Sequence, residues 1–280
     1  MLSPTNVAVT GGTGFLGTHL IHRLRTEGYS VRNFGRQQSI LEPKSADMLV
    51  SEVAALEPKY IIHLAAHQTS LHDGASIAEV LNGGLVLGSL MLEAALQSTA
   101  MFVTIGSYWQ HNRDQNDSTV FYAAAKDAFG QLTNFYQREH DLIVRELTLF
   151  DTYGPGDNRE KLLPTLLKAT ISGERVLLRE PDALINLTYI TDVVEAIMLS
   201  ISTERQPCEV VVRSETFMRI DELVNVIEEV TGRIVNHEYT GEVAINKLKE
   251  PWIFGSPVSN WSPTVDLEKG ISNCLQSLSR

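Results

Sequence analysis

The chain has 280 residues, 43% of them hydrophobic, and a formal net charge of −11 at pH 7. This size and composition are typical of a globular protein with a sizeable core. The acidic balance argues against nucleic-acid binding, which depends on lysines and arginines that neutralise phosphates. No apolar run reaches the roughly 20 residues of a membrane span, and no secretion-signal pattern opens the chain. We therefore expect a cytoplasmic protein that does not enter a membrane.

Strands and helices alternate through the first half of the sequence. Short apolar runs predict strands, and apolar residues at helical spacing predict the helices between them. The expected strands are 6–10, 29–34, 60–65, 101–105 and 142–150, and the expected helices are 16–24, 46–56, 77–97 and 123–137. This alternation predicts an α/β fold with a Rossmann-like doubly wound parallel sheet covered on both faces.

The alternation weakens after Tyr153. A helix at 162–172, a short strand at 176–178 and a helix at 193–201 are expected there. We place one domain at 1–152 and a smaller C-terminal lobe at 153–280, and expect later segments of the chain to return to the first domain.

A glycine-rich turn links the first expected strand to the first helix. Gly11, Gly14 and Gly17 are spaced three residues apart. Glycines at such a turn let the backbone approach a pyrophosphate, which the free amides at the helix N-terminus attract. The residues expected to contact this cofactor are Gly11, Thr13, Gly14, Phe15, Leu16 and Gly17.

The end of the second strand indicates which dinucleotide is preferred. NAD-binding folds often place an acidic residue there, on the adenosine ribose. This chain has Gly35 near that position, followed by Arg36, whose guanidinium suits a 2′-phosphate. We therefore expect NADP(H), with NAD as the alternative, and assign the 1–152 domain to its binding.

Tyr122 and Lys126 lie four residues apart on the last expected helix of the first half. That spacing puts both side chains on one helix face. The ammonium group is expected to stabilise the phenolate and lower the tyrosine pKa, so that Tyr122 exchanges a proton with a hydroxyl or carbonyl near neutral pH. Lys126 is also expected to hold the nicotinamide ribose.

Several separate stretches resemble the extended short-chain dehydrogenase/reductase family, also called the NAD-dependent epimerase/dehydratase family. They run in the family's order along nearly the whole chain. They are the glycine turn 11–17, His63-Leu64-Ala65-Ala66, Tyr122 with Lys126, Tyr153-Gly154-Pro155-Gly156-Asp157, Tyr189-Ile190-Thr191-Asp192-Val193-Val194 and Trp261-Ser262-Pro263.

The resemblance implies roles for these stretches. Leu64, Ala65 and Ala66 would lie beside the cofactor, and Tyr122 would be the catalytic acid/base. The later motifs would help shape a nucleotide-sugar site in the 153–280 lobe. It also implies a homodimer.

Departures from the family pattern bear on the reaction. The usual serine and threonine stretch reads Thr104-Ile105-Gly106-Ser107-Tyr108-Trp109-Gln110 here, so the hydroxyl that polarises a substrate carbonyl is Ser107 or Thr104, with Ser107 favoured. Asp151 stands where an asparagine is common, and Ile185 where an arginine is expected. The expected substrate-binding residues are His67, Trp109, Asp151, Arg159 and Arg213.

The amino-acid sequences of segments 106–111 and 150–157 are most similar to those of nucleotide-sugar 4-ketoreductases of the CDP-abequose synthase type. This similarity implies that NADPH reduces the C4 keto group of a CDP- or dTDP-linked 4-keto-6-deoxy sugar, as in deoxysugar biosynthesis. Tyr122 would protonate the new alkoxide while Ser107 hydrogen-bonds the same oxygen.

Two alternatives stay open. A nucleotide-sugar 4-epimerase would use the same tyrosine and glycine turn with a tightly held NAD. A non-catalytic NADP-binding regulator would keep the fold without the chemistry. The two cysteines, Cys208 and Cys274, and the scattered histidines have no metal-ligand spacing, so we expect no metal.

Overall fold

The computed structural model describes residues 4–35, 42–69, 71–111, 120–203, 207–242 and 254–278. Its centre is a seven-stranded sheet in the order β13-β10-β5-β4-β3-β1-β2, and neighbouring strands are parallel throughout. The strands are β1 (Asn6–Thr10), β2 (Ser30–Phe34), β3 (Tyr60–His63), β4 (Met101–Ser107), β5 (Val144–Leu149), β10 (Glu209–Val212) and β13 (Ser256–Pro257). The predicted Rossmann-like fold is confirmed.

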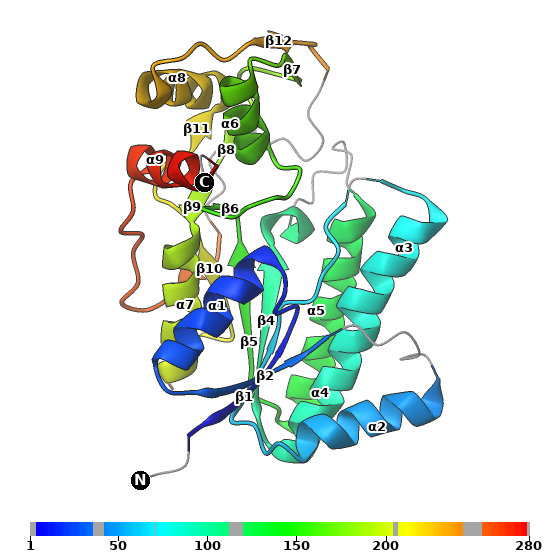
Figure 1. Cartoon of the computed structure of the whole chain (residues 1–280). Coiled ribbons are helices and arrows are strands. Elements are labelled where there is room, and N and C mark those ends of the chain that lie inside the picture. The colour runs from blue at the N-terminus through cyan, green and yellow to red at the C-terminus, as the bar shows by residue number, and fades with distance from the viewer. Residues whose placement is uncertain are drawn as a thin grey trace.

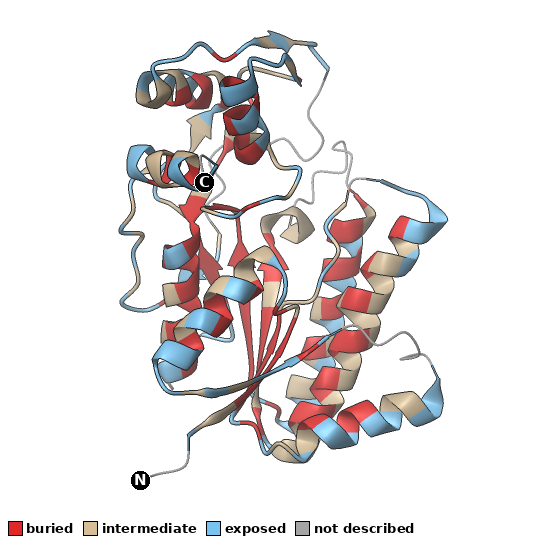
Figure 2. Ribbon diagram, in the orientation of Figure 1, coloured by how far each residue is buried: buried red, intermediate tan, exposed pale blue. Residues whose placement is uncertain are grey.

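Helices cover both faces of the sheet (Figure 1). α1 (Phe15–Thr26) and α7 (Ile190–Ser202) pack on one face, and α2 (Pro43–Ala54), α4 (Leu87–Ser98) and α5 (Phe121–His140) on the other. The central strands β1, β3, β4 and β5 have buried side chains on both faces, and Figure 2 shows the middle of the sheet as the most continuously buried part of the molecule. The carboxyl ends of β1, β3 and β4 therefore form one rigid edge on which a site can be built.

One long apolar helical segment differs from the expectation. A single helix was expected at 77–97, but α3 (Gly74–Val80) and α4 are joined by the π-helical turn η1 (Leu81–Val86). The whole segment has 25 residues and, by length and composition, could cross a membrane, so the expectation that no apolar stretch is that long is wrong. Met91 and Leu92 are fully buried against the sheet, which accounts for its apolar character.

The second half of the chain contributes to two parts of the structure. β10 and β13 extend the central sheet, whereas α6 (Leu162–Ser172), α8 (Ile220–Thr231) and α9 (Leu267–Leu278) pack around a separate core with short strands. Those strands are β6 (Asp151–Tyr153), β7 (Val176–Leu178), β8 (Leu184–Ile185), β9 (Leu187–Tyr189), β11 (Met218–Arg219) and β12 (His237–Tyr239). The sequence reading did not find α8, α9 or β10. The boundary at 152/153 stays a prediction.

Candidate active site

The glycine turn between β1 and α1 has the shape of an anion site. Gly11 has φ +71°, and a Cβ on it would lie 2.6 Å from the Ala65 nitrogen. A Cβ on Gly17 would lie 2.2 Å from the Gly11 oxygen. Gly14 is different, because a Cβ there would meet only the Gly11 oxygen, at 3.3 Å. Gly14 caps α1, and no side chain of the described residues bonds the helix amides, which leaves them available to a phosphate.

The other residues expected to contact the cofactor differ in their exposure. Thr13 is exposed, while Phe15 and Leu16 pack partly into the core that α1 shares with the C-terminal lobe. Gly35 directly follows β2, and a Cβ there would meet nothing within 4 Å. Arg36, on which the expectation of NADP(H) depends, lies outside the described residues.

A buried histidine connects the glycine turn to the π-helical turn. The Thr10 hydroxyl lies 2.8 Å from His63 Nδ1 and accepts from the Ala65 amide at 3.3 Å. His63 Nε2 lies 3.1 Å from the Gly84 carbonyl oxygen. A neutral ring that donates from Nε2 and accepts at Nδ1 satisfies all these contacts. Burial, followed by the charge of Lys126, lowers the His63 pKa to about 3, so the ring stays neutral.

Tyr122 and Lys126 lie one turn apart on α5, and both are only 9% exposed. They line a small pocket that also receives His67. The remaining lining residues are Ala66, Val80, Gly84, Leu85, Ala125 and Phe129. The structure thus brings the predicted tyrosine and lysine next to the loop after β3.

The protonation of this pair differs from the expectation. Burial raises the Tyr122 pKa to about 12, and nearby Arg159 only partly offsets it. Burial also lowers the Lys126 pKa to about 8. Lys126 Nζ lies 6.0 Å from the Tyr122 ring centroid and donates instead to the Ile105 carbonyl oxygen at 2.6 Å. The expected lowering of the Tyr122 pKa by Lys126 is therefore wrong, because desolvation raises this pKa and the charge that partly offsets it is that of Arg159.

The two candidate hydroxyls on β4 have different surroundings. Ser107 ends the strand, and its Oγ accepts from the Trp109 amide at 3.3 Å. Thr104 is 1% exposed and lies beside His63 in the β3–β4 register. Its Oγ1 has no hydrogen-bond partner among the described residues. Ser107 is the hydroxyl at the strand's carboxyl end, where the site lies.

Trp109 follows Ser107 in η2 (Tyr108–His111), a 3₁₀ turn. Its ring meets that of Tyr122 edge to face, with centroids 6.3 Å apart. This contact joins the turn that carries Ser107 to the helix that carries Tyr122 and Lys126. Four predicted residues, from β4, η2 and α5, thus belong to one constellation.

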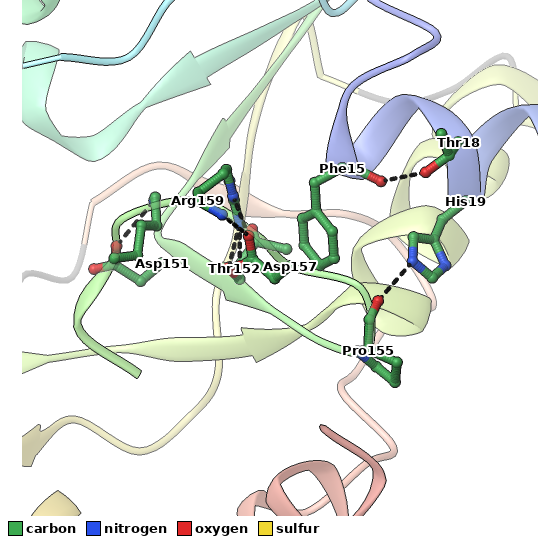
Figure 3. A network of polar contacts seen from close by, with 9 residues as sticks. Phe15, Thr18, His19, Asp151, Thr152, Pro155, Asp157 and Arg159 are labelled. Carbon is green, nitrogen blue, oxygen red and sulfur yellow. Dashed lines mark hydrogen bonds and ion pairs between the residues drawn. The ribbon is translucent and has the colours of Figure 1, made fainter. Parts of the chain in front are cut away.

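The predicted polar substrate contacts have partners within the chain. Asp151 accepts from the Tyr108 hydroxyl and from Lys161 Nζ, each at 3.2 Å. Arg159 forms a two-point ion pair with Asp157, at 2.7 and 2.8 Å. Figure 3 shows this pair beside Phe15, and the guanidinium lies 4.5 Å from that ring's centroid. Arg159 therefore joins the loop after β6 to the start of α1.

Arg213 directly follows β10. Its Nη1 donates to the Ser214 carbonyl oxygen at 3.1 Å, and its guanidinium lies 5.6 Å from the Phe217 ring centroid. Phe217 contacts Phe150, and Tyr108 stacks on Phe150. The rings of Phe217 and Phe150 thus connect Arg213 to Tyr108, the first residue of η2.

The two later motifs, those that contain Asp192 and Trp261, form hydrogen bonds between distant segments of the chain. The Asp192 carboxylate accepts from the Thr264 hydroxyl at 2.7 Å and from the Val265 amide at 3.1 Å. Trp261 Nε1 donates to the Asp192 carbonyl oxygen at 2.8 Å. The resemblance implied that these motifs shape a substrate site, but the contacts observed for Asp192 and Trp261 hold the segment before α9 against α7.

Two polar residues near Ser107 escaped the sequence reading. Gln110 accepts from the Ser107 amide at 2.9 Å and donates to Glu146 at 2.6 Å. Glu146 is only 8% exposed, and burial raises its pKa. The available signal was a charged residue, Glu146, within the mostly apolar strand expected at 142–150. Among the described residues, no group of three or more histidine, cysteine or acidic side chains could hold a metal.

Comparisons with known proteins agree with this geometry. Residues 7–212 match the model of the NAD dependent epimerase/dehydratase family. CDP-abequose synthase from Yersinia pseudotuberculosis is 28% identical over 210 residues, 71% of this chain and 74% of that protein. The enzyme of the same name from Salmonella muenchen is 26% identical, and the match covers 96% of each chain.

A solved structure shows the same fold over nearly the whole chain. UDP-glucuronic acid 4-epimerase from Bacillus cereus, in complex with UDP-glucuronic acid and NAD, superposes with a TM-score of 0.80 at 17% identity. The superposition covers 98% of this chain and 99% of that one. With the family model spanning the glycine turn, the tyrosine helix and β10, the chain belongs to the NAD dependent epimerase/dehydratase family.

Proposed function

We propose that this protein is a nucleotide-sugar 4-ketoreductase, in which NADPH reduces the C4 keto group of a CDP- or dTDP-linked 4-keto-6-deoxy sugar. The observation that carries the proposal is the convergence of Tyr122, Lys126 and Ser107 at one edge of the sheet. The family supplies nicotinamide chemistry, and these residues supply the proton and the oxygen contacts that a ketone reduction needs.

Tyr122 acts as the proton donor. Its pKa of about 12 keeps the phenol protonated at neutral pH, which is the form required to protonate an alkoxide. Lys126 lies near enough to favour the phenolate that remains after transfer. The protonated phenol of the structure is thus ready for reduction, whereas oxidation of an alcohol would first require its proton to leave.

Ser107 orients the substrate oxygen. Because its Oγ already accepts from the Trp109 amide, the hydroxyl hydrogen is free to point to a ligand. The substrate carbonyl oxygen then receives one hydrogen bond from Ser107 and one from Tyr122. Thr104, buried within the sheet, cannot offer its hydroxyl in the same way without moving the strand.

The chain's residues fit a dinucleotide. The uncapped amides of α1 and the open side of Gly14 would hold the pyrophosphate, and Lys126 would exchange its bond to the Ile105 carbonyl for the nicotinamide ribose. When bound, NADPH would supply a hydride to C4 and be left as NADP⁺. Tyr122 would give its proton to the C4 oxygen, so that the ketone would become an alcohol, and solvent would restore the tyrosine proton.

The substrate assignment has separate support. Two CDP-abequose synthases match the chain at 28% and 26% identity, and the stretches 106–111 and 150–157 are those that resemble such ketoreductases. We place His67 and Trp109 against the sugar because both adjoin Tyr122. Asp151, Arg159 and Arg213 are proposed to reach the diphosphate or base side of the substrate.

NADPH oxidation tests the reaction directly. Purified protein is mixed with CDP- or dTDP-4-keto-6-deoxyglucose and NADPH, and the absorbance at 340 nm is followed. We expect oxidation by the wild type and a loss of about 1,000-fold in Tyr122→Phe, with unchanged cofactor binding. The variant Tyr29→Phe, in the connection between α1 and β2, is the matched control and should stay active.

The outcome separates the reductase from its rivals. Cofactor binding without NADPH oxidation would overturn the proposal. Conversion of a nucleotide sugar to its C4 epimer with no net change at 340 nm would identify an epimerase instead. A protein that binds NADP(H) and converts none of these substrates would fit a regulator.

Cofactor preference needs its own comparison. We propose that Arg36 selects NADP(H), supported by the lack of a carboxylate at Gly35. Arg36→Ala should raise the KM for NADPH about tenfold and leave that for NADH unchanged. Arg32→Ala is the control, because Arg32 lies on β2 and pairs with Glu52. Equal KM changes for both cofactors would remove Arg36 from recognition.

A homodimer in the cytoplasm also stays a proposal. Phe135 on α5 is 50% exposed, and such a side chain on a helix face is compatible with a subunit contact. Sedimentation equilibrium of the wild type and of Phe135→Lys measures the oligomeric state. A monomeric wild type at micromolar concentration would contradict the dimer.

A further inference from the structure

Gln110 and Glu146 lie directly behind the serine of the site. Gln110 belongs to the 3₁₀ turn that follows Ser107, and Glu146 lies in the neighbouring strand β5. Neither residue is used in the reaction proposed above. Their side chains nevertheless connect the end of β4 to the interior of the sheet.

The Gln110 carboxamide is fixed at both ends. Its Oε1 accepts from the Ser107 amide at 2.9 Å, and its Nε2 donates to Glu146 Oε1 at 2.6 Å. The amide donor on one side and the carboxylate on the other allow only one orientation of the group. The backbone at Ser107 is therefore held by a side chain from within its own turn.

Glu146 has a space shaped for its carboxylate. A Cβ on Gly106 would lie 2.5 Å from Glu146 Oε1, and a Cβ on Gly130 of α5 would lie 3.9 Å from Oε2. The carboxylate thus fills the gap between β4 and α5 where a larger residue at 106 would clash. A buried carboxylate is costly to keep without a role.

A second contact of the same kind lies beside the first. His111 Nε2 is 3.3 Å from the Thr148 hydroxyl, two residues further along β5. The last two residues of the turn, Gln110 and His111, therefore both contact β5. Since Trp109 also bonds Ser107 Oγ, the position of the turn determines where the serine hydroxyl lies.

We propose that Gln110 and Glu146 are positioning residues, which clamp the Tyr108–His111 turn on β5 and thereby fix the Ser107 hydroxyl relative to Tyr122. The inference rests on the proposed function for its effect on catalysis, but the clamp itself does not. It predicts that the two side chains can exchange places. A carboxylate at 110 can accept from the Ser107 amide, and a carboxamide at 146 can donate to it.

Exchange of the two residues tests the clamp. Gln110→Glu sets two carboxylates against each other, and we expect kcat to fall about 100-fold, as for a reacting group displaced by about 1 Å. The KM for NADPH should change less than about twofold, because the α1 amides proposed to hold the pyrophosphate belong to another part of the chain. Gln110→Glu/Glu146→Gln should recover kcat to within about fivefold of the wild type. Gln131→Glu, on the exposed side of α5, is the matched control.

A measurement without substrate separates the clamp from the reaction. Hydrogen exchange of the peptide 105–111 should be faster in Gln110→Glu and in Gln110→Ala, and slow again in the double variant. Gln110→Ala keeps the test usable if the charge pair prevents folding. If the wild type oxidises no NADPH but the exchange pattern holds, the proposed function fails and the clamp stands.

Two results would contradict the proposed clamp. Folded Gln110→Glu and Gln110→Ala with wild-type kcat and wild-type amide protection would overturn the clamp. A double variant no better than Gln110→Glu would also overturn it, because the lost property would then not be the bond between the two side chains.

Discussion

The motifs of the first and second halves differ in what their polar atoms contact. Tyr122 and Lys126 line a pocket, and the amides of α1 near Gly14 bond no side chain of the described residues. In the later motifs, the Asp192 carboxylate and the Trp261 ring nitrogen are bonded within the chain. Stretches that resemble one family therefore differ in structure: those of the first half face a pocket or leave helix amides open, and those of the second half hold segments of the chain together.

The two regions also differ in the free-energy cost of their buried polar groups. Burial lowers the Lys126 pKa to about 8, so the charged form costs free energy, and Thr104 Oγ1 is buried with no partner among the described residues. Asp192 is 3% exposed, but its carboxylate is bonded. Changes in the first region should cost activity, and changes in the second should cost stability.

The largest expected effect is on activity, from Lys126→Met. We expect a loss of about 1,000-fold in kcat/KM, because the phenolate of Tyr122 loses its cation. The unfolding free energy should not fall, since an apolar side chain replaces a desolvated ammonium group. Enzyme assays and urea denaturation measure the two quantities. Lys168→Met, on the exposed side of α6, is the control. A lower unfolding free energy for Lys126→Met would contradict the expectation that changes in the first region cost activity and not stability.

The glycine turn offers a matched pair within one motif. Gly17→Ala should lower the unfolding free energy by about 3 kcal/mol, since its Cβ would meet the Gly11 carbonyl oxygen. Gly14→Ala should cost less than about 1 kcal/mol yet weaken NADP(H) binding about tenfold or more, because its Cβ points to the open side. Denaturation without cofactor and a fluorescence titration distinguish them. Equal destabilisation by both would place Gly14 in the packing as well.

Asp192→Asn tests the second region. The asparagine amide has the shape of the carboxylate but only one acceptor oxygen and no charge. It therefore cannot accept the hydrogen bonds from both Thr264 and Val265, and we expect a loss of about 2 kcal/mol in unfolding free energy. The kcat of the folded variant should stay within about twofold of the wild type. Asp47→Asn, at an exposed position of α2, is the control. A large fall in kcat at temperatures where the variant is folded would assign Asp192 to the site.

The smallest expected effect is a pH dependence from His63, which joins the glycine turn to η1. Its pKa is about 3 in the folded chain and about 6.5 when unfolded, so its contribution is present above pH 6.5 and is lost as pH falls towards 3. Between pH 6.5 and 5 we expect the wild type to lose about 1.6 kcal/mol relative to His63→Gln. Parallel stability curves would mean that the ring is protonated at little cost. His140→Gln, at an exposed site, should follow the wild type.

Local patterns were enough for the strand-turn-helix units of the first half. Glycine spacing predicted the turn at 11–17, and helical spacing predicted that Tyr122 and Lys126 share a face, because both depend on neighbours a few residues away. The π-helical turn was missed because Gly83 and Gly84 look like any small residues in a helix. Its register involves the bond between Gly84 and His63, 21 residues distant.

By itself, the sequence determined the fold class, the glycine turn proposed to bind the cofactor and the residues that carry the proposed proton transfer. Only the tertiary structure decided their environment: Tyr122 is a buried acid with a raised pKa, Arg159 is held by Asp157, and Gln110 and Glu146 support Ser107. Spacing along the chain fixes which groups share a helix face or a turn. Burial and cross-strand contacts, which set protonation and orientation, arise only when segments distant in the sequence pack together.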